Sequence, residues 1–242
     1  MNSTMIVARR EFRSNFDSPI GYVVIALSLL GVGVFFFRDY WTINRATLYP
    51  LFTWIPWAFV FPIIPAVTMR LFAEEKRTGT LELLITMPVR DREVVVGKFL
   101  ATLGLIGVLL LLTVTYPLTI SRLGQLDWGP IGVGYLGLLL EASAGIAIGL
   151  FFSSITENQI VAFMLTFVTL LMLFAIDYVG AAAGGIFGDI FAFISFQRRL
   201  APFGRGLLDL RNVVYFLSVA AFFLMLTTRQ LETRKRKSVP SA

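Results

Sequence analysis

Long apolar stretches alternate with short polar ones along most of this chain. A helix of about 20 residues crosses the hydrocarbon core of a bilayer, and several of the apolar stretches reach that length. Backbone polar groups inside a bilayer must be hydrogen-bonded within the segment, so these spans are expected to be helical. We therefore predict an all-α integral membrane protein with six transmembrane helices, at about residues 20–37, 51–69, 94–120, 131–152, 160–179 and 213–228.

The second predicted span is unusual because it contains three prolines, Pro56, Pro62 and Pro65. Proline lacks an N–H and clashes with the preceding turn, so each one disturbs the hydrogen-bond ladder of a helix. Within a membrane such breaks are tolerated where neighbouring helices satisfy the freed carbonyls. We expect a kinked helix that is packed inside the protein.

A short charged stretch follows directly, with the sequence EEKRTGTLELL at residues 74–84. Because apolar spans flank it on both sides, it must lie in water at one membrane face. Leu81 and Leu84 stand three residues apart, which favours an amphipathic helix, with Thr78 or Thr80 as its N-cap. We predict a docking helix at about residues 74–87 that transmits force from a soluble partner, and the alternative is an ordinary solvated loop.

Residues 1–17 precede the first span and carry several arginines. Met5, Ala8, Phe12 and Phe16 fall on one helical face, whereas the arginines lie mostly elsewhere. This pattern is typical of an amphipathic helix at the surface of an anionic membrane. We predict an N-terminal interfacial helix.

The stretch between the fifth and sixth spans, residues 180–211, is apolar at first but irregular. It is broken by Asp189 and contains Gly180, Gly184 and Gly188 at four-residue spacing. Glycines at this spacing allow close helix packing. We predict a re-entrant or interfacial hairpin here.

Basic residues are distributed unevenly between the two predicted sides of the membrane. Fourteen of the 21 Lys and Arg residues fall within residues 1–17, 70–98 and 229–242. Loops rich in Lys and Arg remain in the cytoplasm. We therefore place both termini, the 74–84 stretch and the basic tail at 230–242 in the cytoplasm, and the chain in a plasma membrane as a multi-pass protein.

Composition narrows the range of functions. The chain has 242 residues, is 57% hydrophobic and 15% charged, and has a mean hydropathy of +0.78, which leaves no room for a soluble catalytic domain. It contains no Cys and no His, which excludes thiolate and imidazole metal sites and Cys–His or Ser–His catalysis. The net charge of +6 arises from residues that flank apolar spans, so nucleic acid is not an expected partner.

No nucleotide-binding loop is apparent either. The pair Gly97-Lys98 lacks the upstream glycine and the following Ser or Thr of a Walker A motif. We expect no catalytic residue, cofactor or metal on this chain, so any ATP hydrolysis belongs to another subunit.

Glu141 is the acidic residue predicted nearest the middle of a span. An intramembrane carboxylate is costly, so it is expected to have a polar partner or to line a water-filled path. The interpretations are a structural hydrogen bond, a proton or substrate role, and a predicted span whose true boundary places Glu141 elsewhere. Gly145 and Gly149 follow it and are predicted to allow close helix packing.

Several stretches together resemble the membrane subunits of type-2 ABC exporters, in particular the compact six-span permeases of the gliding-motility and nitrous-oxide-reductase-maturation types. The resemblance begins with SPIGY at 18–22 and is strongest over 74–84, which is followed by Pro88. It continues with TENQ at 156–159 and with RGLLDLRNVVY at 205–215, and it covers essentially the whole chain.

The resemblance implies a dimeric permease, with a second copy or a similar subunit, bound to two copies of a separate cytoplasmic ATPase that carries ATP and Mg. It further implies export across a bacterial inner membrane and an extracytoplasmic accessory protein as a candidate partner. The implied coupling-helix residues are Glu74, Glu75, Arg77, Thr78, Gly79, Thr80, Leu81, Glu82, Leu83 and Leu84. A second ATPase contact is implied at Thr156, Glu157, Asn158 and Gln159, and an outer re-entrant segment at Asp189, Arg205, Gly206, Asp209 and Arg211.

Two other functions remain open from the sequence. An energy transducer would pass ATPase motion to an outer partner through residues 180–211 without transport. An ion-coupled transporter would use Glu141 to carry protons.

Overall fold

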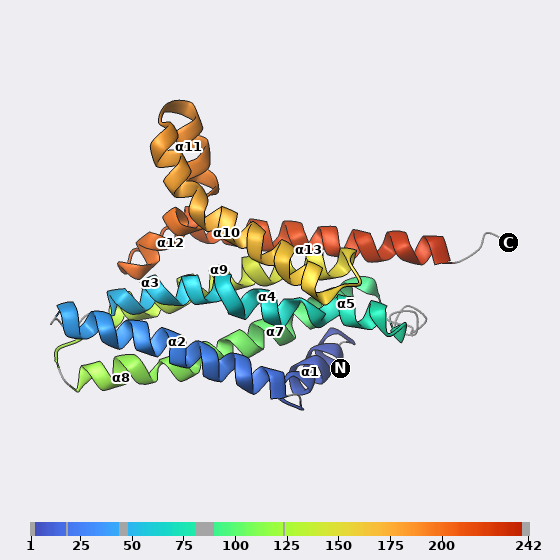
Figure 1. The fold of residues 1–242 in the computed structure, drawn as a ribbon, viewed down its shortest axis with the longest axis horizontal. Helices are drawn as coiled ribbons and strands as arrows, with labels where there is room; N and C mark the ends of the chain where they lie inside the picture. Colours follow the sequence, from blue (N-terminus) through green and yellow to red (C-terminus); the bar gives the residue numbers. More distant parts are fainter. Residues whose placement is uncertain (1–2, 18, 44–47, 81–89, 123, 239–242) are drawn as a thin grey trace.

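The computed structural model describes residues 3–17, 19–43, 48–80, 90–122 and 124–238. All regular secondary structure in these ranges is helical, which confirms the predicted all-α class (Figure 1). The first half contains α1 (Ser3–Asp17), α2 (Pro19–Ile43), α3 (Tyr49–Ala58), the π-helical turn η1 (Phe59–Ile63), α4 (Ile64–Thr68), α5 (Arg70–Arg77), α7 (Asp91–Thr113) and α8 (Thr115–Ser121). The second half contains α9 (Trp128–Ile155), α10 (Gln159–Ala183), α11 (Gly185–Ile194), α12 (Phe196–Gly204) and α13 (Leu210–Ser238).

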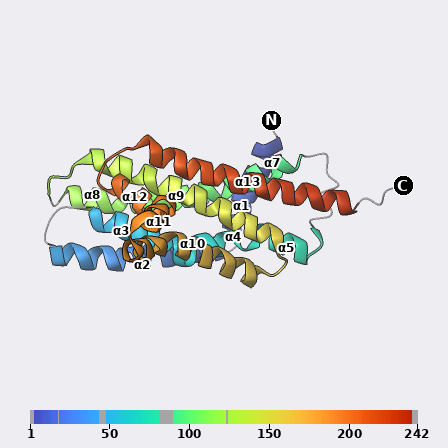
Figure 2. The same cartoon turned by 90° about the horizontal axis from the view of Figure 1, so that it is seen from above.

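Five helical runs among the described residues are long and apolar enough to cross a membrane. The long helices α2, α9 and α13 extend along the longest axis of the molecule in both views (Figures 1 and 2). The five runs overlap five of the six predicted spans, and they are Gly21–Arg38, Asp91–Ser121, Trp128–Ile155, Gln159–Ala182 and Leu210–Thr233.

The second predicted span, at 51–69, is helical but not continuous. It is divided into α3, η1 and α4, and the N–H of Ile64 donates to the carbonyl of Phe59, five residues back. Pro62 lies inside the π-helical turn and has no N–H to donate, so the regular i→i−4 ladder cannot pass through it. This broken run is not among the five candidate spans, so a sixth crossing remains a prediction.

Helix α9 forms the centre of the molecule. Of its apolar length 78% is buried, against 56% or less in the other four candidate spans. A Cβ atom added at Gly145 would lie 2.7 Å from Ile64 Cδ1, and one at Gly149 would collide with the Thr68 side chain. The two glycines therefore allow α4 to approach α9 closely, as their spacing predicted.

Helix α1 packs along the start of α7. A Cβ atom at Gly97 would lie 2.7 Å from a methyl carbon of Val7, and one at Gly104 would lie 3.2 Å from the ring of Phe12. The apolar face predicted for residues 1–17 is thus used at least partly for packing against the protein. Whether α1 also contacts a membrane surface stays a prediction.

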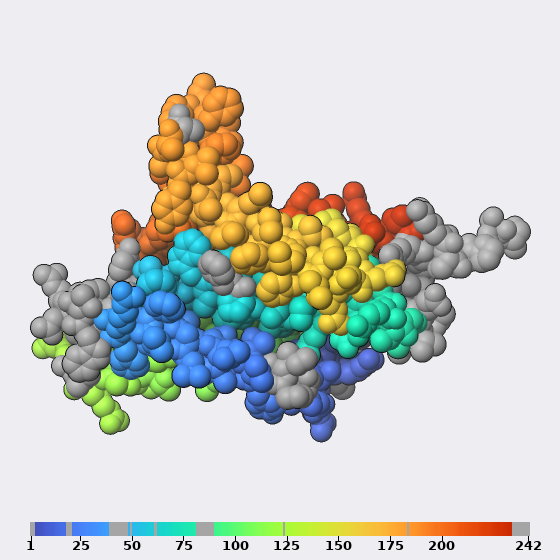
Figure 3. Space-filling model, viewed as in Figure 1, coloured from blue at the N-terminus to red at the C-terminus, as the bar shows by residue number. Residues whose placement is uncertain are grey.

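The C-terminal part of α10 and helix α11 form a hairpin that projects from the body of the molecule and is called the α10–α11 hairpin below, whereas the first part of α10 packs on the body (Figures 1 and 3). The chain reverses at Gly184 and Gly185, whose φ angles of +62° and +58° suit glycine. The two arms cross at Gly180, where an added Cβ would lie 2.9 Å from Phe191 Cβ. The glycine-rich segment therefore forms a helical hairpin, and whether it re-enters a membrane stays a prediction.

Candidate functional site

One end of the bundle gathers most of the polar contacts between helices. This end is called the polar end below. It comprises α1, α5 with the following residues Thr78–Thr80, the first turns of α7, and residues 153–159, which form the end of α9 and the turn into α10. The N-terminal helix, α5 and the C-terminal part of α13 lie toward this end (Figure 1). The predicted coupling segment and the predicted second contact are both part of it.

Ser153 of α9 caps α5 from outside the helix. Its Oγ accepts hydrogen bonds from the N–H of Phe72 at 3.0 Å and of Ala73 at 3.1 Å, and it donates to the carbonyl of Met69 at 3.0 Å. The first N–H groups of a helix have no partner within it, and no side chain of α5's own N-cap residue supplies one. The start of α5 is thereby fixed to α9.

Lys76 provides a second connection between α5 and the end of α9. It is buried, and its Nζ donates to the carbonyl of Ser154 and, at 3.5 Å, to the carbonyl of Thr156. Lysine carbonyl contacts of this kind are charge-assisted and stronger than neutral hydrogen bonds. The structure thus brings residues 74–77 of the predicted coupling segment next to the predicted second contact at 156–159.

A buried lysine, Lys98 of α7, joins three helices. Its Nζ lies 2.6 Å from Glu75 Oε1 on α5 and 3.3 Å from Glu11 Oε1 on α1. Lys98 is only 1% exposed, so the two carboxylates replace the water that its ammonium group would otherwise require. Arg70 of α5 adds a further bond to α1, from Nη2 to Asn15 Oδ1 at 2.9 Å.

The environment of Glu75 is mixed. Burial raises the pKa of its carboxyl above the ordinary value, and the ammonium of Lys98 acts in the opposite direction. Its second oxygen, Oε2, is buried without a hydrogen-bond partner among the described residues. Glu75 is therefore held mainly by Lys98, and the pair depends on both members.

The helix that contains Glu74 and Glu75 ends earlier than predicted. Helix α5 closes at Arg77, and Gly79 has a φ of +72°, so residues 74–79 do not continue as one helix toward 87. The hydroxyl of Thr78 donates to the carbonyl of Glu74 at 2.9 Å, which closes the end of α5. Whether Thr78 or Thr80 also caps a later helix stays a prediction, because residues 81–89 lie outside the described part of the chain. Glu74, Arg77, Thr78, Gly79 and Thr80 are all exposed.

The remaining predicted coupling residues, Leu81, Glu82, Leu83 and Leu84, lie outside the described residues, as does the rest of the predicted helix to 87. Their docking role stays a prediction from the sequence.

The predicted second contact forms the turn between α9 and α10. Asn158 Oδ1 accepts from the N–H of Ile160 at 2.9 Å and of Val161 at 3.4 Å, which caps α10. Thr156 Oγ1 accepts from the N–H of Asn158 at 3.1 Å. Glu157 and Asn158 are exposed, whereas Thr156 and Gln159 are half-buried, so a partner can reach this turn chiefly through Glu157.

Glu141 lies deep inside the molecule, on α9. It is 2% exposed, and neither of its carboxylate oxygens has a hydrogen-bond partner among the described residues. The structural hydrogen bond that the sequence suggested therefore has no partner in the described part of the chain.

The predicted outer residues serve separate local purposes. Asp189 is exposed on α11, and Arg205 is exposed just after α12. Gly206 has a φ of +80°, and an added Cβ would lie 2.8 Å from Pro130 Cα. Asp209 Oδ1 accepts from the N–H of Arg211 at 2.9 Å, where α13 begins. These contacts shape turns and helix ends and do not by themselves form a binding site.

Metal binding has no obvious place in the described ranges, because no group of three or more Asp, Glu, His or Cys side chains is close enough there to hold an ion.

The sequence did not single out Ser153, Lys76 or Lys98 as important. In the sequence Lys98 counts as a topology signal and as part of an incomplete Walker A match, although a lysine four residues inside an apolar run must be paired if the run is buried. Ser153 gave no signal, because its role depends on which helix start lies beside it in space.

Comparison with known families agrees with the resemblance noted in the sequence. A family model described as ABC-2 family transporter protein matches residues 5–227 of the chain. A search of curated proteins finds no match. The family match includes all of the polar end except the first residues of α1, and all of the candidate membrane spans except the end of the last.

Proposed function

The chain belongs to the ABC-2 transporter family and is a membrane subunit of an ABC transporter, and from this premise we propose that it couples ATP hydrolysis to export. In this proposal a separate cytoplasmic ATPase, present in two copies and carrying ATP and Mg, binds the polar end. A second permease copy or a similar subunit completes the transmembrane unit. Substrate passes across a bacterial plasma membrane along the interface between the two membrane subunits.

The polar end supports this proposal because it can act as a lever. A force applied to α5 is passed to α9 through Ser153 and Lys76, and to α7 and α1 through Lys98. Helix α9 is the most buried of the candidate spans, so its displacement must move the helices packed around it. The single observation that carries the proposal is the capping of α5 by Ser153.

The exposed side of the polar end supplies groups for a partner surface. Glu74 and Arg77 are exposed charges that can fix the orientation of a bound subunit. In the sequence, Leu81, Leu83 and Leu84 follow immediately and offer apolar area for a groove. The charge bias of the sequence places this end and both termini in the cytoplasm, where an ATPase resides.

An energy transducer is the second candidate function, and the α10–α11 hairpin favours it. None of the residues of α11 is buried, and Ile186 and Phe187 are 79% and 69% exposed. A projecting apolar hairpin offers a surface through which an outer partner could receive ATPase motion without transport. An ion-coupled transporter based on Glu141 is the third candidate, and its support is that the Glu141 carboxylate has no hydrogen-bond partner within the described ranges.

Purification of the tagged chain in mild detergent tests the main proposal. We expect a soluble subunit with a Walker A motif to co-purify at a stoichiometric ratio, and a Glu82→Arg/Leu84→Asp variant to lose it. An Asp189→Arg/Phe187→Asp variant, altered on the projecting hairpin, serves as the matched control and should retain the subunit. A stable membrane complex with no ATPase subunit would contradict the proposal.

The event to which ATP hydrolysis is coupled, substrate movement or an outer protein partner, distinguishes the export and transducer functions. In vesicles containing the complex, export predicts substrate accumulation that requires ATP. ATP hydrolysis that depends on an outer protein partner, with no solute or lipid moved, would replace export by the transducer function.

A further inference from the structure

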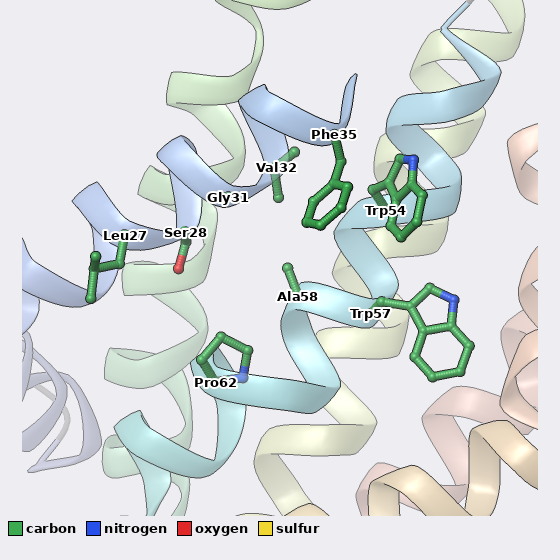
Figure 4. Close-up of a pocket in the computed structure, with 9 residues that line it drawn as sticks. All are labelled: Leu27, Ser28, Gly31, Val32, Phe35, Trp54, Trp57, Ala58 and Pro62. Atoms are coloured by element: carbon green, nitrogen blue, oxygen red, sulfur yellow. The ribbon is translucent and has the colours of Figure 1, made fainter. Parts of the chain in front are cut away.

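A groove on the outer face of α2 has no role in the proposed coupling. It runs between α2 and the broken run α3–η1 and has a volume of about 520 Å³ (Figure 4). Side chains from the two elements face each other across it, and Figure 4 shows the ring of Phe35 beside that of Trp54. Its lining residues are Leu27, Ser28, Gly31, Val32, Phe35, Trp54, Trp57, Ala58 and Pro62.

The described lining of the groove is apolar, and its one hydroxyl is already hydrogen-bonded to the backbone. Ser28, the one hydroxyl-bearing residue among the described lining residues, donates its proton to the carbonyl of Val24 at 2.6 Å. Phe35 of α2 and Trp54 of α3 stack with ring centroids 4.5 Å apart, so the two sides of the groove meet there through flat hydrocarbon surfaces. A groove of this kind binds a hydrocarbon chain and rejects a polar solute, which would leave its hydrogen bonds unmade.

Two features of the sequence create the groove. The π-helical turn η1 carries Pro62, which prevents a regular helix from continuing past α2 at this level. On the opposite side Gly31 has no side chain, and an added Cβ would meet nothing within 4 Å. The space is therefore present because of Gly31 and the break, and a larger residue at 31 would occupy it.

The position of the groove indicates what surrounds it. Helix α2 is a candidate membrane span of which only 28% is buried, and its outward side chains Val23, Leu30 and Val34 are apolar and exposed. A groove on the outward face of such a span opens into the hydrocarbon of the bilayer.

A charged residue follows the groove-lining residues along α2. Leu27, Gly31 and Phe35 follow one another at helical spacing, and Arg38 lies one turn beyond Phe35 on the same stripe of α2. Arg38 is exposed and ends the candidate span, which is the level of lipid phosphates. An apolar groove that is followed along its helix by a cation one turn further on complements a phospholipid, whose acyl chain and phosphate have the same order.

We propose that this groove holds one acyl chain of a membrane phospholipid, with the lipid phosphate near Arg38. The bilayer supplies this ligand at high concentration, and stacked aromatic walls restrict an acyl chain more than open lipid does. The bound lipid fills the space beside the π-helical turn and stabilises the broken span that leads to the polar end. The proposal goes beyond coupling and export and holds whichever of the candidate functions is correct.

Native mass spectrometry of the purified protein tests the proposal. The protein is reconstituted in vesicles of phosphatidylglycerol and phosphatidylcholine, extracted in mild detergent and measured with its bound lipid. The wild type should retain one phospholipid per chain, and Gly31→Phe should lower that retention by about tenfold, a difference of about 1.4 kcal/mol in binding. Gly107→Phe is the matched control, because an added Cβ at Gly107 on α7 also meets nothing within 4 Å.

Each other outcome has a defined meaning. Equal lipid retention in wild type and Gly31→Phe, or no retention in either, would overturn the proposal. Loss of self-association in Gly31→Phe, with lipid unchanged, would assign the groove to a second copy instead. Retention of phosphatidylglycerol that is unaffected by Arg38→Gln would overturn the phosphate contact.

A measurement on the wild type avoids dependence on folding of the variants. A phosphatidylglycerol with a diazirine on its acyl chain should label peptides containing Trp54 or Trp57 more strongly than peptides from α7 or α13. Even labelling over all lipid-facing helices would also overturn the proposal.

Discussion

The polar end and the α10–α11 hairpin are built on opposite principles. At the polar end, Ser153, Lys76 and Lys98 connect four helices through hydrogen bonds and ion pairs with buried partners. In the hairpin, close contact at Gly180 and a tight turn at Gly184 and Gly185 bring the two arms together, and α11 buries no residue.

The difference shows which region can transmit force and which can move. Buried polar contacts are costly to break because each partner is left unsatisfied, so they hold helices in one arrangement. A hairpin with little buried surface opens at low cost. The polar end is therefore suited to pass motion into the bundle, and the hairpin is suited to respond to it or to meet a partner.

Replacement of Lys98 by methionine tests the polar end most severely. Lys98→Met leaves Glu75 and Glu11 without their shared cation, and we expect a loss of about 3 kcal/mol in the free energy of unfolding. Thermal unfolding in detergent measures it. A second variant, Lys98→Met/Glu75→Gln, should recover part of the loss because one carboxylate is removed, and no recovery would argue against the pairing.

The capping of α5 is tested by two neighbouring serines. Ser153→Ala removes the acceptor for two N–H groups of α5 and should cost about 1–3 kcal/mol, with transport reduced more than ATP hydrolysis. Ser154→Ala is a matched control because, in the part of the chain that the structure describes, the Ser154 hydroxyl bonds within its own helix, to the carbonyl of Phe151. Equal effects of the two substitutions on coupling would contradict the claim that α5 passes force to α9 through Ser153.

The hairpin should tolerate damage without disturbing the bundle. Gly180→Leu pushes α11 away from α10, and we expect faster amide hydrogen exchange in residues 185–194, with the unfolding free energy of the body changed by less than about 0.5 kcal/mol. Ile186→Ala, at a position 79% exposed, should change neither quantity. Destabilisation of the body by Gly180→Leu would show that the two regions are not separable.

The smallest expected effect concerns how the stability of the protein depends on pH. Burial raises the pKa of Glu75 above its ordinary value of 4.5, so its contribution to stability is fully present below that value and is lost as pH rises through the folded-state pKa. The loss should be slight, because Lys98 stabilises the ionised form. The difference in unfolding temperature between wild type and Glu75→Gln, followed as pH rises from below 4.5, measures this contribution. A stability of the wild type that rises with pH relative to Glu75→Gln would contradict the prediction.

The membrane character and approximate helix positions were readable from the sequence because hydropathy and length are local properties. The three prolines of 51–69 indicated a kink, but the π-helical turn depends on how the freed carbonyls repack. The sequence also predicts a helix from 74 to 87. Helix α5 ends at Arg77 and Gly79 adopts a positive φ, so the first part of this stretch is interrupted, and residues 81–87 lie outside the described residues, where the helix stays a prediction.

The contacts that make the polar end could not be predicted in the same way. Ser153 and Phe72 are 81 residues apart in the sequence, and their bond exists only because α9 is the central helix. All the spans are similarly apolar, so hydropathy gives no reason to place α9 rather than another span at the centre. Only Glu141 and the spacing of Gly145 and Gly149 point to close packing of this helix. Glu141 stands out in the sequence because it is a charge in an apolar run, whereas Lys98 lies near a cluster of basic residues and does not stand out.

Site-specific photo-crosslinking tests the central claim most directly, that the polar end rather than the hairpin receives the ATPase. A photoreactive amino acid is placed at Thr80 or Glu157 on the polar end, or at Phe187 or Asp189 on the hairpin, all of which are exposed. In membranes containing the whole complex, we expect the first two positions to capture a subunit with a Walker A motif and the last two to capture none. Capture of that subunit from the hairpin, and not from Thr80 or Glu157, would contradict the account.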